Sequence, residues 1–233
     1  MNMNRIKRII NIKKSIILLS GGLDSLVSLG LKREELNITL ALTFDYGQKS
    51  VEKEIEASRK ICEFYNVEHK VIKLDWLKEI TNTSLVSAKD VPTGVELDNP
   101  EKSAQSVWVP NRNGLFLNIA ASFADSQDYD YILIGANREE GQTFPDNTQD
   151  FIDSLNKEFE YSTQKKPKVV APLINYVKND IVMLALQYKI PLELTQSCYQ
   201  DSAKHCGICE SCTRLRHALE ANHDTHYIKL LFG

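Results

Sequence analysis

The chain has 233 residues, of which 42% are hydrophobic and 25% charged, and its formal net charge is −3. This length suits one larger α/β domain, or such a domain with a small appendage. The slightly acidic balance argues against a broad surface for duplex DNA or tRNA, so we expect no nucleic-acid partner. No apolar run approaches the roughly 18 residues of a membrane span, so we expect no membrane partner either.

Residues 1–14 form a basic leader, which is followed by a short apolar run rather than by the longer apolar core of a signal peptide. We therefore expect a cytoplasmic protein. An α/β domain is expected over residues 15–190, with a long polar loop over residues 80–107 inside it. Residues 191–233 hold most of the cysteines and form a separate C-terminal segment in this division.

A glycine-rich turn follows the first apolar run. Ile16–Leu19 leads directly into Ser20-Gly21-Gly22-Leu23-Asp24-Ser25, and an apolar helical pattern comes next. This order predicts a buried parallel strand, a tight turn and a helix. Two glycines let the backbone approach a ligand closely, and the helix N-terminus presents N–H groups to an anion. The turn is therefore expected to bind phosphate, although it lacks the spacing and the lysine of a Walker A loop.

Strand and helix patterns alternate in the next part of the chain. Ile38–Phe44 and Val67–Leu74 predict strands, and an amphipathic helix is expected over residues 50–65 between them. This β-α-β-α-β opening predicts an α/β protein with an open, mostly parallel, doubly wound sheet. Cys62 falls on the apolar face of the helix, and we interpret it as a small core residue rather than a nucleophile.

Two more strands are expected at Tyr131–Gly135 and Val169–Ile174, and a buried helix over residues 114–124. The segment Lys178–Tyr188 predicts an amphipathic helix. The residues expected on its apolar face are Ile181, Leu184, Ala185 and Tyr188.

Polar residues follow the predicted strands at their carboxyl ends, where open parallel sheets bind ligands. Asp45 and Gln48 come after the second strand, within reach of a nucleotide, although a solvated turn would contain the same residues. Arg112 is expected near a helix N-terminus, where the dipole disfavours positive charge. It therefore needs an anionic partner, which is a phosphate, a substrate carboxylate or an acidic side chain in a structural ion pair.

The segment 136–148 follows the fourth strand and is rich in carboxylates and amides. Phe144 could stack on a planar heterocycle, and the acidic side chains could accept hydrogen bonds from ring N–H and amino groups. A solvated acidic loop is the alternative. Thr148 is expected to cap the helix that follows.

Four cysteines near the C-terminus have the spacing of a metal site. Cys198, Cys206, Cys209 and Cys212 fall within a short stretch, with two Cys-x-x-Cys spacings that share Cys209. Four thiolates suit tetrahedral zinc and leave no open position for water, so the metal is expected to be structural. An iron–sulfur cluster is the alternative metal group, and His205 is a poorer candidate ligand than Cys198.

In their combination and order these motifs resemble the 7-cyano-7-deazaguanine synthase family, within the ATP pyrophosphatases. The resemblance covers about residues 15–217. Asn111 stands where bacterial members commonly have glycine, and residues 140–148 are similar to the archaeal pattern instead. The motifs that carry the resemblance are Ser20–Ser25, Asp45–Gln48, Val109-Pro110-x-Arg112-Asn113, Phe144-Pro145-Asp146 and the four cysteines.

The resemblance implies an adenine-nucleotide alpha-hydrolase-like (HUP) sheet with a small C-terminal zinc-binding helical segment. It implies an ATP-dependent ligase that converts 7-carboxy-7-deazaguanine and ammonia to 7-cyano-7-deazaguanine through adenylated intermediates, as a precursor of archaeosine or queuosine in tRNA. ATP, Mg²⁺ and one structural Zn²⁺ per chain are implied, with small-molecule substrates as partners. The oligomeric state is left open, and a homodimer is compatible with the sequence.

The resemblance also assigns roles to individual residues of this sequence. The catalytic residues implied are Ser20, Asp24, Ser25 and Arg112. The ATP-binding residues implied are Leu19, Ser20, Gly21, Gly22, Leu23, Asp24, Ser25, Leu26, Asp45 and Gln48. The substrate-binding residues implied are Asn111, Arg112, Asn113, Glu139, Glu140, Phe144, Pro145 and Asp146. The metal ligands implied are Cys198, Cys206, Cys209 and Cys212.

Two other functions are compatible with parts of the sequence. A tRNA thiolase shares the phosphate-binding turn but needs a free sulfur-carrying cysteine, which is not evident here. A non-catalytic zinc module that binds RNA would explain the cysteines but not the turn, and its expected basic stripe is missing.

Overall fold

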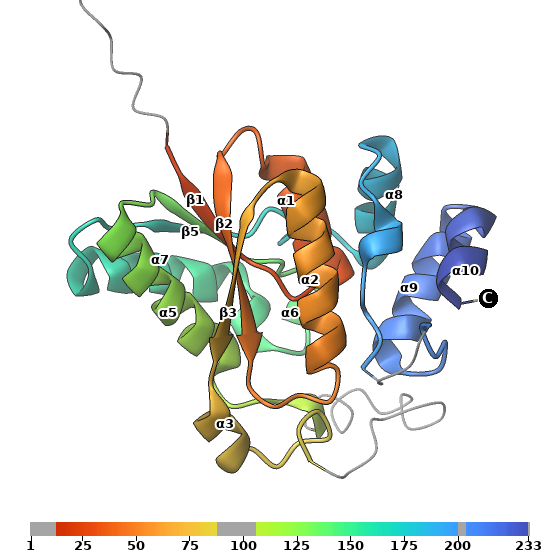
Figure 1. Ribbon diagram of the computed structural model, residues 1–233, viewed down its shortest axis with the longest axis horizontal. Helices are drawn as coiled ribbons and strands as arrows, with labels where there is room; N and C mark the ends of the chain where they lie inside the picture. The colour runs from red at the N-terminus through yellow and green to blue at the C-terminus, as the bar shows by residue number, and fades with distance from the viewer. Residues whose placement is uncertain (1–12, 88–105, 200–203, 233) are drawn as a thin grey trace, which may run out of the picture.

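A five-stranded parallel sheet forms the centre of the protein (Figure 1), in a computed structural model that describes residues 13–87, 106–199 and 204–232. The strands are ordered β3-β2-β1-β4-β5, and every neighbouring pair is parallel. Their bounds are β1 Ser15–Leu18, β2 Ile38–Asp45, β3 Glu68–Lys73, β4 Tyr131–Leu133 and β5 Lys168–Val170. The predicted open parallel α/β sheet is confirmed. The strand order reverses between β1 and β4, and this is the point where such sheets bind ligands.

Helices cover both faces of the sheet. The helices α1 (Leu23–Lys32) and α2 (Val51–Tyr65) lie on one face, and α5 (Arg112–Gln127) and α7 (Gln149–Ser162) lie on the other (Figure 1). β1 shows why its sequence is apolar throughout. Ile16 packs into the core on the α5 side, whereas Ile17 packs into the core on the α1 side. Both side chains are fully buried, so the predicted doubly wound arrangement is confirmed.

The remaining elements are short or lie near the C-terminus. They are α3 Asp75–Glu79, α6 Arg138–Gly141, η2 Pro145–Asn147, α8 Lys178–Gln187, η3 Leu192–Leu194, α9 Glu210–Ala221 and α10 Thr225–Phe232. Segment 136–148, expected as a loop, therefore contains α6 and η2. Thr148 caps α7 as predicted, since its side chain accepts a hydrogen bond from the Phe151 N–H.

The predicted apolar face of α8 is wrong at one position. Ile181 and Ala185 are buried as expected, but the side chain of Tyr188 is 59% exposed. Lys178 and Val182 complete the buried face instead. Tyr188 lies one residue beyond the end of α8, whereas the ammonium group of Lys178 at the start of the helix turns inward to the carboxylate of Asp24.

Leu215, Leu219 and Leu231 from α9 and α10 share one buried cluster with residues of α1 and α8. The division of the chain at residue 190 stays a prediction. The basic leader lies outside the described residues except for residues 13 and 14, and most of the loop 80–107 lies outside them too. Within the described ranges no helix has the length and apolar character needed to cross a membrane.

Candidate functional site

The glycine-rich turn joins β1 to α1 at the carboxyl edge of the sheet. Gly21 has φ +75°, and a Cβ there would lie 2.9 Å from the Cβ of Ala57, so only glycine fits without strain. Ser25 Oγ donates to the carbonyl of Gly22 over 3.1 Å and lies 3.2 Å from Ser20 Oγ. Among the described residues no side chain caps the start of α1. Its first N–H groups are therefore available to an anion.

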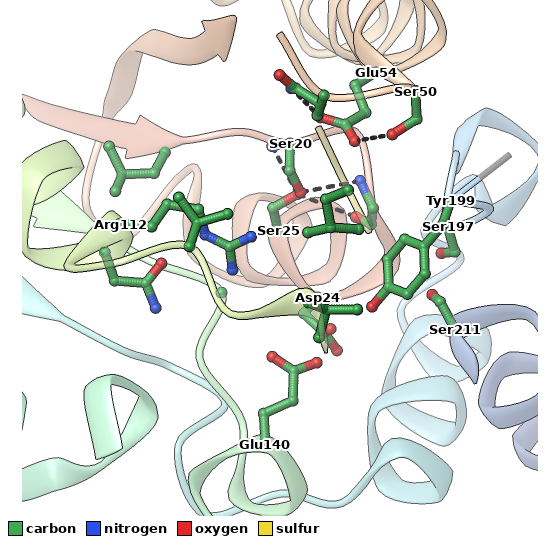
Figure 2. Close-up of a pocket in the computed structure, with 18 of the residues that line it drawn as sticks. Ser20, Asp24, Ser25, Ser50, Glu54, Arg112, Glu140, Ser197, Tyr199 and Ser211 are labelled. Atoms are coloured by element: carbon green, nitrogen blue, oxygen red, sulfur yellow. Dashed lines mark hydrogen bonds between the residues drawn. The ribbon is translucent and has the colours of Figure 1, made fainter. Parts of the chain in front are cut away.

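A cavity of about 270 Å³ opens beside this turn (Figure 2). Its wall is built from the ends of β1, β2 and β4 and from segments as distant in sequence as Leu18 and Arg214. Six predicted ATP-binding residues of the turn region line it: Leu19, Ser20, Gly22, Leu23, Asp24 and Ser25. Gln48 and the predicted substrate-binding residues Arg112, Asn113, Glu140, Phe144 and Asp146 line the same cavity.

Six other predicted site residues do not line the cavity. The Asp45 carboxylate instead accepts a hydrogen bond from the Gly47 N–H over 3.2 Å and shapes the turn after β2. Glu139 accepts a hydrogen bond from the backbone N–H of Lys178 over 2.9 Å and thereby holds α8. The six predicted site residues that are absent from the cavity wall are Gly21, Leu26, Asp45, Asn111, Glu139 and Pro145.

Asp24 and Lys178 form a buried ion pair in the wall. Lys178 Nζ lies 2.6 Å from Asp24 Oδ2 and 3.6 Å from Glu140 Oε1. Burial raises the pKa of Asp24, and Lys178 opposes that rise. Burial opposes the charge on Lys178, but Asp24 and Glu140 outweigh it and raise the pKa of the ammonium group. The second carboxylate oxygen, Asp24 Oδ1, is buried and has no hydrogen-bond partner among the described residues. A buried oxygen in this state is suited to bind a cation.

Arg112 is the first residue of α5, and its guanidinium points into the cavity (Figure 2). Its Nη1 donates a hydrogen bond to Tyr46 Oη over 3.4 Å. Burial disfavours the charge, but Tyr46 and Asp146 outweigh burial and raise the pKa of Arg112, so it stays cationic. No salt bridge within 4.0 Å to Arg112 occurs among the described residues. An anionic ligand would supply the partner that this cation lacks.

A further carboxylate, that of Glu54, reaches the cavity from α2. Glu54 accepts hydrogen bonds from Ser50 Oγ over 2.5 Å and from Gln48 Nε2 over 2.8 Å. Burial raises the pKa of Glu54 despite these two donors. The predicted nucleotide contact Gln48 therefore also orients an acidic side chain in the wall.

Several wall residues were missed by the sequence reasoning. Lys178 was taken only as the start of an amphipathic helix, and its inward position gives no periodic signal. Glu54 lies on a helix face that reads as charged and solvated. Tyr46 lies within the recognised motif Asp45–Gln48, and Trp108 adjoins the motif that begins at Val109, so these motifs are the signal that could have found them. The missed wall residues include Tyr46, Ser50, Glu54, Trp108, Lys178 and Tyr199.

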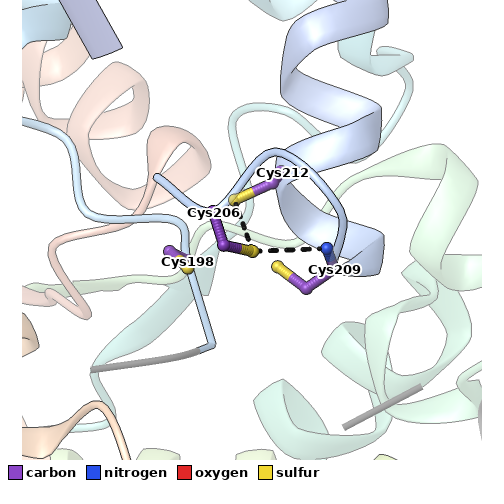
Figure 3. Close-up of side chains that lie close together, drawn as sticks. All are labelled: Cys198, Cys206, Cys209 and Cys212. Carbon is purple, nitrogen blue, oxygen red and sulfur yellow. Dashed lines mark hydrogen bonds between the residues drawn. The ribbon is translucent and has the colours of Figure 1, made fainter. Parts of the chain in front are cut away.

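The four cysteines come together beside the cavity (Figure 3). Their sulfur atoms all lie within 4.8 Å of one another. Tetrahedral zinc with Zn–S bonds of about 2.3 Å needs sulfur atoms about 3.8 Å apart, and Cys206 Sγ lies 3.9 Å from Cys212 Sγ. Neighbouring thiols raise the pKa of Cys212, so a bound cation is what would hold all four as thiolates. The donor set fits a metal, and Cys198 lines the cavity as well.

His205 and Cys62 both have contacts or burial that indicate a structural role. His205 Nε2 accepts a hydrogen bond from the Ser197 N–H over 3.1 Å, which occupies that ring nitrogen. The side chain of Cys62 is 2% exposed, and burial raises the pKa of its thiol to about 12. The interpretation of Cys62 as a core residue is confirmed, and its thiol is unsuited to sulfur transfer.

The fold and the cavity define an α/β protein with a glycine-rich turn at the carboxyl edge of a parallel sheet. The family model described as "Queuosine biosynthesis protein QueC" matches residues 14–223. The chain belongs to this family, as its motifs predicted.

Curated relatives agree with the family match over nearly their full length. The 7-cyano-7-deazaguanine synthase of Methanosarcina barkeri is 49% identical over 216 residues, which cover 89% of this chain and 94% of the relative. That of Carboxydothermus hydrogenoformans is 46% identical over 214 residues, covering 90% of this chain and 100% of the relative. Among solved structures, a 4-thiouridine synthetase–RNA complex with bound ATP aligns with a TM-score of 0.48 and 19% identity, over 94% of this chain and 52% of that one.

Proposed function

We propose that this protein is an ATP-dependent 7-cyano-7-deazaguanine synthase that makes the precursor of archaeosine or queuosine. The observation that carries the proposal is a single cavity in which a phosphate-binding turn and a half-buried arginine come together, in a chain of this family. Among the described residues this arginine forms no salt bridge. The turn suits the pyrophosphate of ATP, and Arg112 suits a carboxylate or a phosphate.

The reaction activates a poor leaving group twice. The carboxylate of 7-carboxy-7-deazaguanine attacks the α-phosphorus of ATP and releases pyrophosphate, giving an acyl adenylate. Ammonia displaces AMP to form the amide. The amide oxygen then attacks the α-phosphorus of a second ATP with release of a second pyrophosphate, and loss of AMP with two protons leaves the nitrile. The chain contributes positioning and charge stabilisation. In this proposal Ser20, Ser25 and the N–H groups of α1 bind pyrophosphate, and Arg112 orients the carboxylate beside the α-phosphate.

Mg²⁺ fits the wall of the cavity at Asp24. The unpaired Asp24 Oδ1 is a hard oxygen ligand beside the turn that would hold the phosphates. When bound there, Mg²⁺ would offset the negative charge of the phosphate oxygens. We propose zinc for the four cysteines, with a structural role because all four positions are filled by protein thiolates.

The remaining assignments are proposals of the same kind. The proposed partners are the small-molecule substrates, and no nucleic acid or membrane partner is proposed. The proposed location is the cytoplasm. The oligomeric state is left open between a monomer and a homodimer. The rival tRNA thiolase is disfavoured because Cys62 is buried and the other four cysteines gather in one cluster. A non-catalytic zinc module that binds RNA leaves the phosphate-binding turn without a role.

The direct test is incubation of the protein with ATP, ammonium and 7-carboxy-7-deazaguanine, followed by mass spectrometry of the product. The nitrile is expected, with AMP and pyrophosphate. Asp24→Asn is the matched variant, because it keeps the shape and a hydrogen-bond acceptor for Lys178 but weakens a cation site. It should remain folded and lose ATP consumption. ATP consumption at the wild-type rate in Asp24→Asn would refute the proposed role of Asp24 in cation and ATP binding. A product other than the nitrile would refute the proposed reaction.

A further inference from the structure

The cavity wall contains an acidic residue, Glu54, to which the proposed reaction gives no role. Glu54 lies in the first turn of α2 and lines the same cavity as the glycine-rich turn and Arg112. Its side chain is half-buried, and among the described residues it forms no salt bridge. A carboxylate that is partly removed from water in this way is stabilised by a cation or by a proton.

The other carboxylates of the wall are held in ion pairs or belong to the predicted substrate site. Two of them share the ammonium group of Lys178, and a third lies 2.5 Å from Arg214 Nη2. These three and the predicted substrate residue are Asp24, Glu140, Glu210 and Asp146. Glu54 is therefore the wall carboxylate that remains for a further cationic ligand.

Two neutral donors fix the orientation of the Glu54 carboxylate. Ser50 Oγ donates to its Oε1 over 2.5 Å, and Gln48 Nε2 donates to its Oε2 over 2.8 Å (Figure 2). A carboxylate has about four acceptor sites, so about two of them stay available to a ligand. An ammonium ion donates hydrogen bonds in several directions and can use these sites. Mg²⁺ suits the place less well, because it needs a near-octahedral set of oxygen ligands and Gln48 presents an N–H donor.

Glu54 lies near the parts of the wall that would hold an acyl adenylate. Its backbone carbonyl oxygen is 3.0 Å from the position that a Cβ on Gly21 would occupy, so α2 packs directly on the glycine-rich turn. Burial raises the pKa of Glu54 and the charge of Arg112 opposes that rise, so the two side chains are within electrostatic reach. Arg112 is the residue proposed to orient the substrate carboxylate. The nucleophile must reach the carbon of that carboxylate, and Glu54 is on the same side of the cavity.

We propose that Glu54 binds ammonium in the cavity and accepts a proton from it, which releases ammonia as the nucleophile for the acyl adenylate. This inference rests on the proposed function and adds a catalytic residue to it. The freed lone pair of ammonia forms the C–N bond at the carbonyl carbon. The bond from that carbon to the AMP oxygen breaks, and AMP leaves with the electron pair. The nitrogen then loses a second proton to water, which gives the amide.

The ammonium dependence of nitrile formation tests this role. Glu54→Gln keeps the size of the side chain and both hydrogen bonds, because the Ser50 hydroxyl can accept as well as donate. It should raise the KM for ammonium at least roughly ten-fold and leave the KM values for ATP and the deazapurine within about two-fold. Glu54→Asp keeps the charge and should recover part of the ammonium affinity. Glu52→Gln, at an exposed position of α2 outside the cavity wall, is the matched control and should change none of the three KM values.

A partial reaction separates ammonium binding from adenylation. Exchange of labelled pyrophosphate into ATP needs 7-carboxy-7-deazaguanine but no ammonium, so it reports the first adenylation alone. In Glu54→Gln the exchange rate should stay within about three-fold of the wild-type rate, while nitrile formation at low ammonium falls at least roughly ten-fold. A merely structural role of Glu54 would lower both rates alike, and that result would overturn the proposal.

The remaining outcomes separate this inference from the proposed function. An unchanged ammonium KM in Glu54→Gln refutes the role of Glu54 even where the wild type makes the nitrile. A higher Mg²⁺ requirement in place of a higher ammonium KM would assign Glu54 to the metal and overturn the proposal. A wild type that makes no nitrile refutes the proposed function and this inference with it. Where Glu54→Gln does not fold, Ser50→Ala decides, because loss of one orienting donor should raise the ammonium KM about three-fold, and an unchanged value refutes the proposal.

Discussion

Lys178 Nζ lies 2.6 Å from Asp24 Oδ2, and the two side chains are only 10% and 16% exposed. The residues are 154 positions apart in the sequence. Because Asp24 belongs to the glycine-rich turn and Lys178 is the first residue of α8, the pair ties these two elements together. The same ammonium group lies 3.6 Å from Glu140 Oε1. One lysine thus holds two carboxylates in the cavity wall.

Removing this lysine should destabilise the protein and inactivate it. Lys178→Met leaves the buried carboxylate of Asp24 without a cation, and the loss of one partner of a buried pair costs about 3 kcal/mol. Urea unfolding followed by circular dichroism measures this change, and nitrile formation should fall at least about ten-fold. The double variant Lys178→Met with Asp24→Asn should recover part of the stability.

A second lysine provides the control for Lys178. Lys165 Nζ lies 2.6 Å from Asp128 Oδ1, but the side chain of Asp128 is 77% exposed. Lys165→Met should therefore cost less than about 1 kcal/mol. Equal losses in the free energy of unfolding in the two lysine variants would show that burial of the Asp24–Lys178 pair does not add to stability.

The two glycines of the turn should respond differently to alanine. Gly21→Ala places a Cβ 2.9 Å from Ala57 Cβ at φ +75°, and we expect a loss of about 2–4 kcal/mol in the free energy of unfolding. Gly22 has φ −77°, and its nearest contact for a Cβ is Ser20 Oγ at 3.3 Å. Gly22→Ala should fold almost normally yet bind ATP more weakly, because Gly22 lines the cavity. Thermal unfolding and calorimetric ATP titration measure the two effects. Wild-type stability in Gly21→Ala would contradict the described turn.

Loss of the metal should also disturb the cavity, because Cys198 belongs both to the cysteine cluster and to the cavity wall. Cys209→Ala is expected to lose the one zinc per chain, to unfold the C-terminal region and to lower turnover, because the cysteine cluster also supports the wall at Cys198 and Tyr199. Zinc content by elemental mass spectrometry is the measurement. Cys62→Ala removes a buried thiol outside the cluster and should retain the zinc. Full zinc occupancy in Cys209→Ala would contradict the ligand set.

His69 should make stability depend on pH. Thr43 Oγ1 donates to the carbonyl of Leu19, so the His69 ring N–H donates to Thr43 Oγ1 over 2.8 Å. Burial lowers the pKa of His69 below its ordinary value of 6.5. As the pH falls through 6.5, the unfolded chain therefore takes up a proton before the folded chain does, and the free energy of unfolding decreases.

The comparison of wild type with His69→Gln isolates this titration. Glutamine keeps a donor for Thr43 but does not titrate. Urea unfolding at about pH 7.5 and pH 5.5 should show a larger loss of stability on acidification in the wild type than in the variant. An equal loss in both proteins would assign the acid sensitivity to other groups.

The sequence predicted the sheet because its signals are local. Ile16–Leu19 is buried on both faces and therefore reads as a continuous apolar run, and the glycines of the turn follow it directly. The cysteine cluster was predictable for the same reason, since metal ligands have a characteristic spacing. The cavity wall was only partly predictable. Lys178 faces inward because of Asp24, a partner far away in sequence, and no periodicity records that contact. The role of Asp45 stays a prediction, because a carboxylate at a strand end can shape a turn, as Asp45 does through the Gly47 N–H, as readily as contact a ligand.

The cavity draws on segments that lie far apart in the described chain, from Leu18 at the end of β1 to Arg214 on α9. A fragment that ends before Tyr199 would keep the glycine-rich turn but lack the wall residues Tyr199 and Arg214. We therefore expect a protein that is cut between α8 and α9 to lose part of its cavity wall, although all five strands of the sheet lie before the cut.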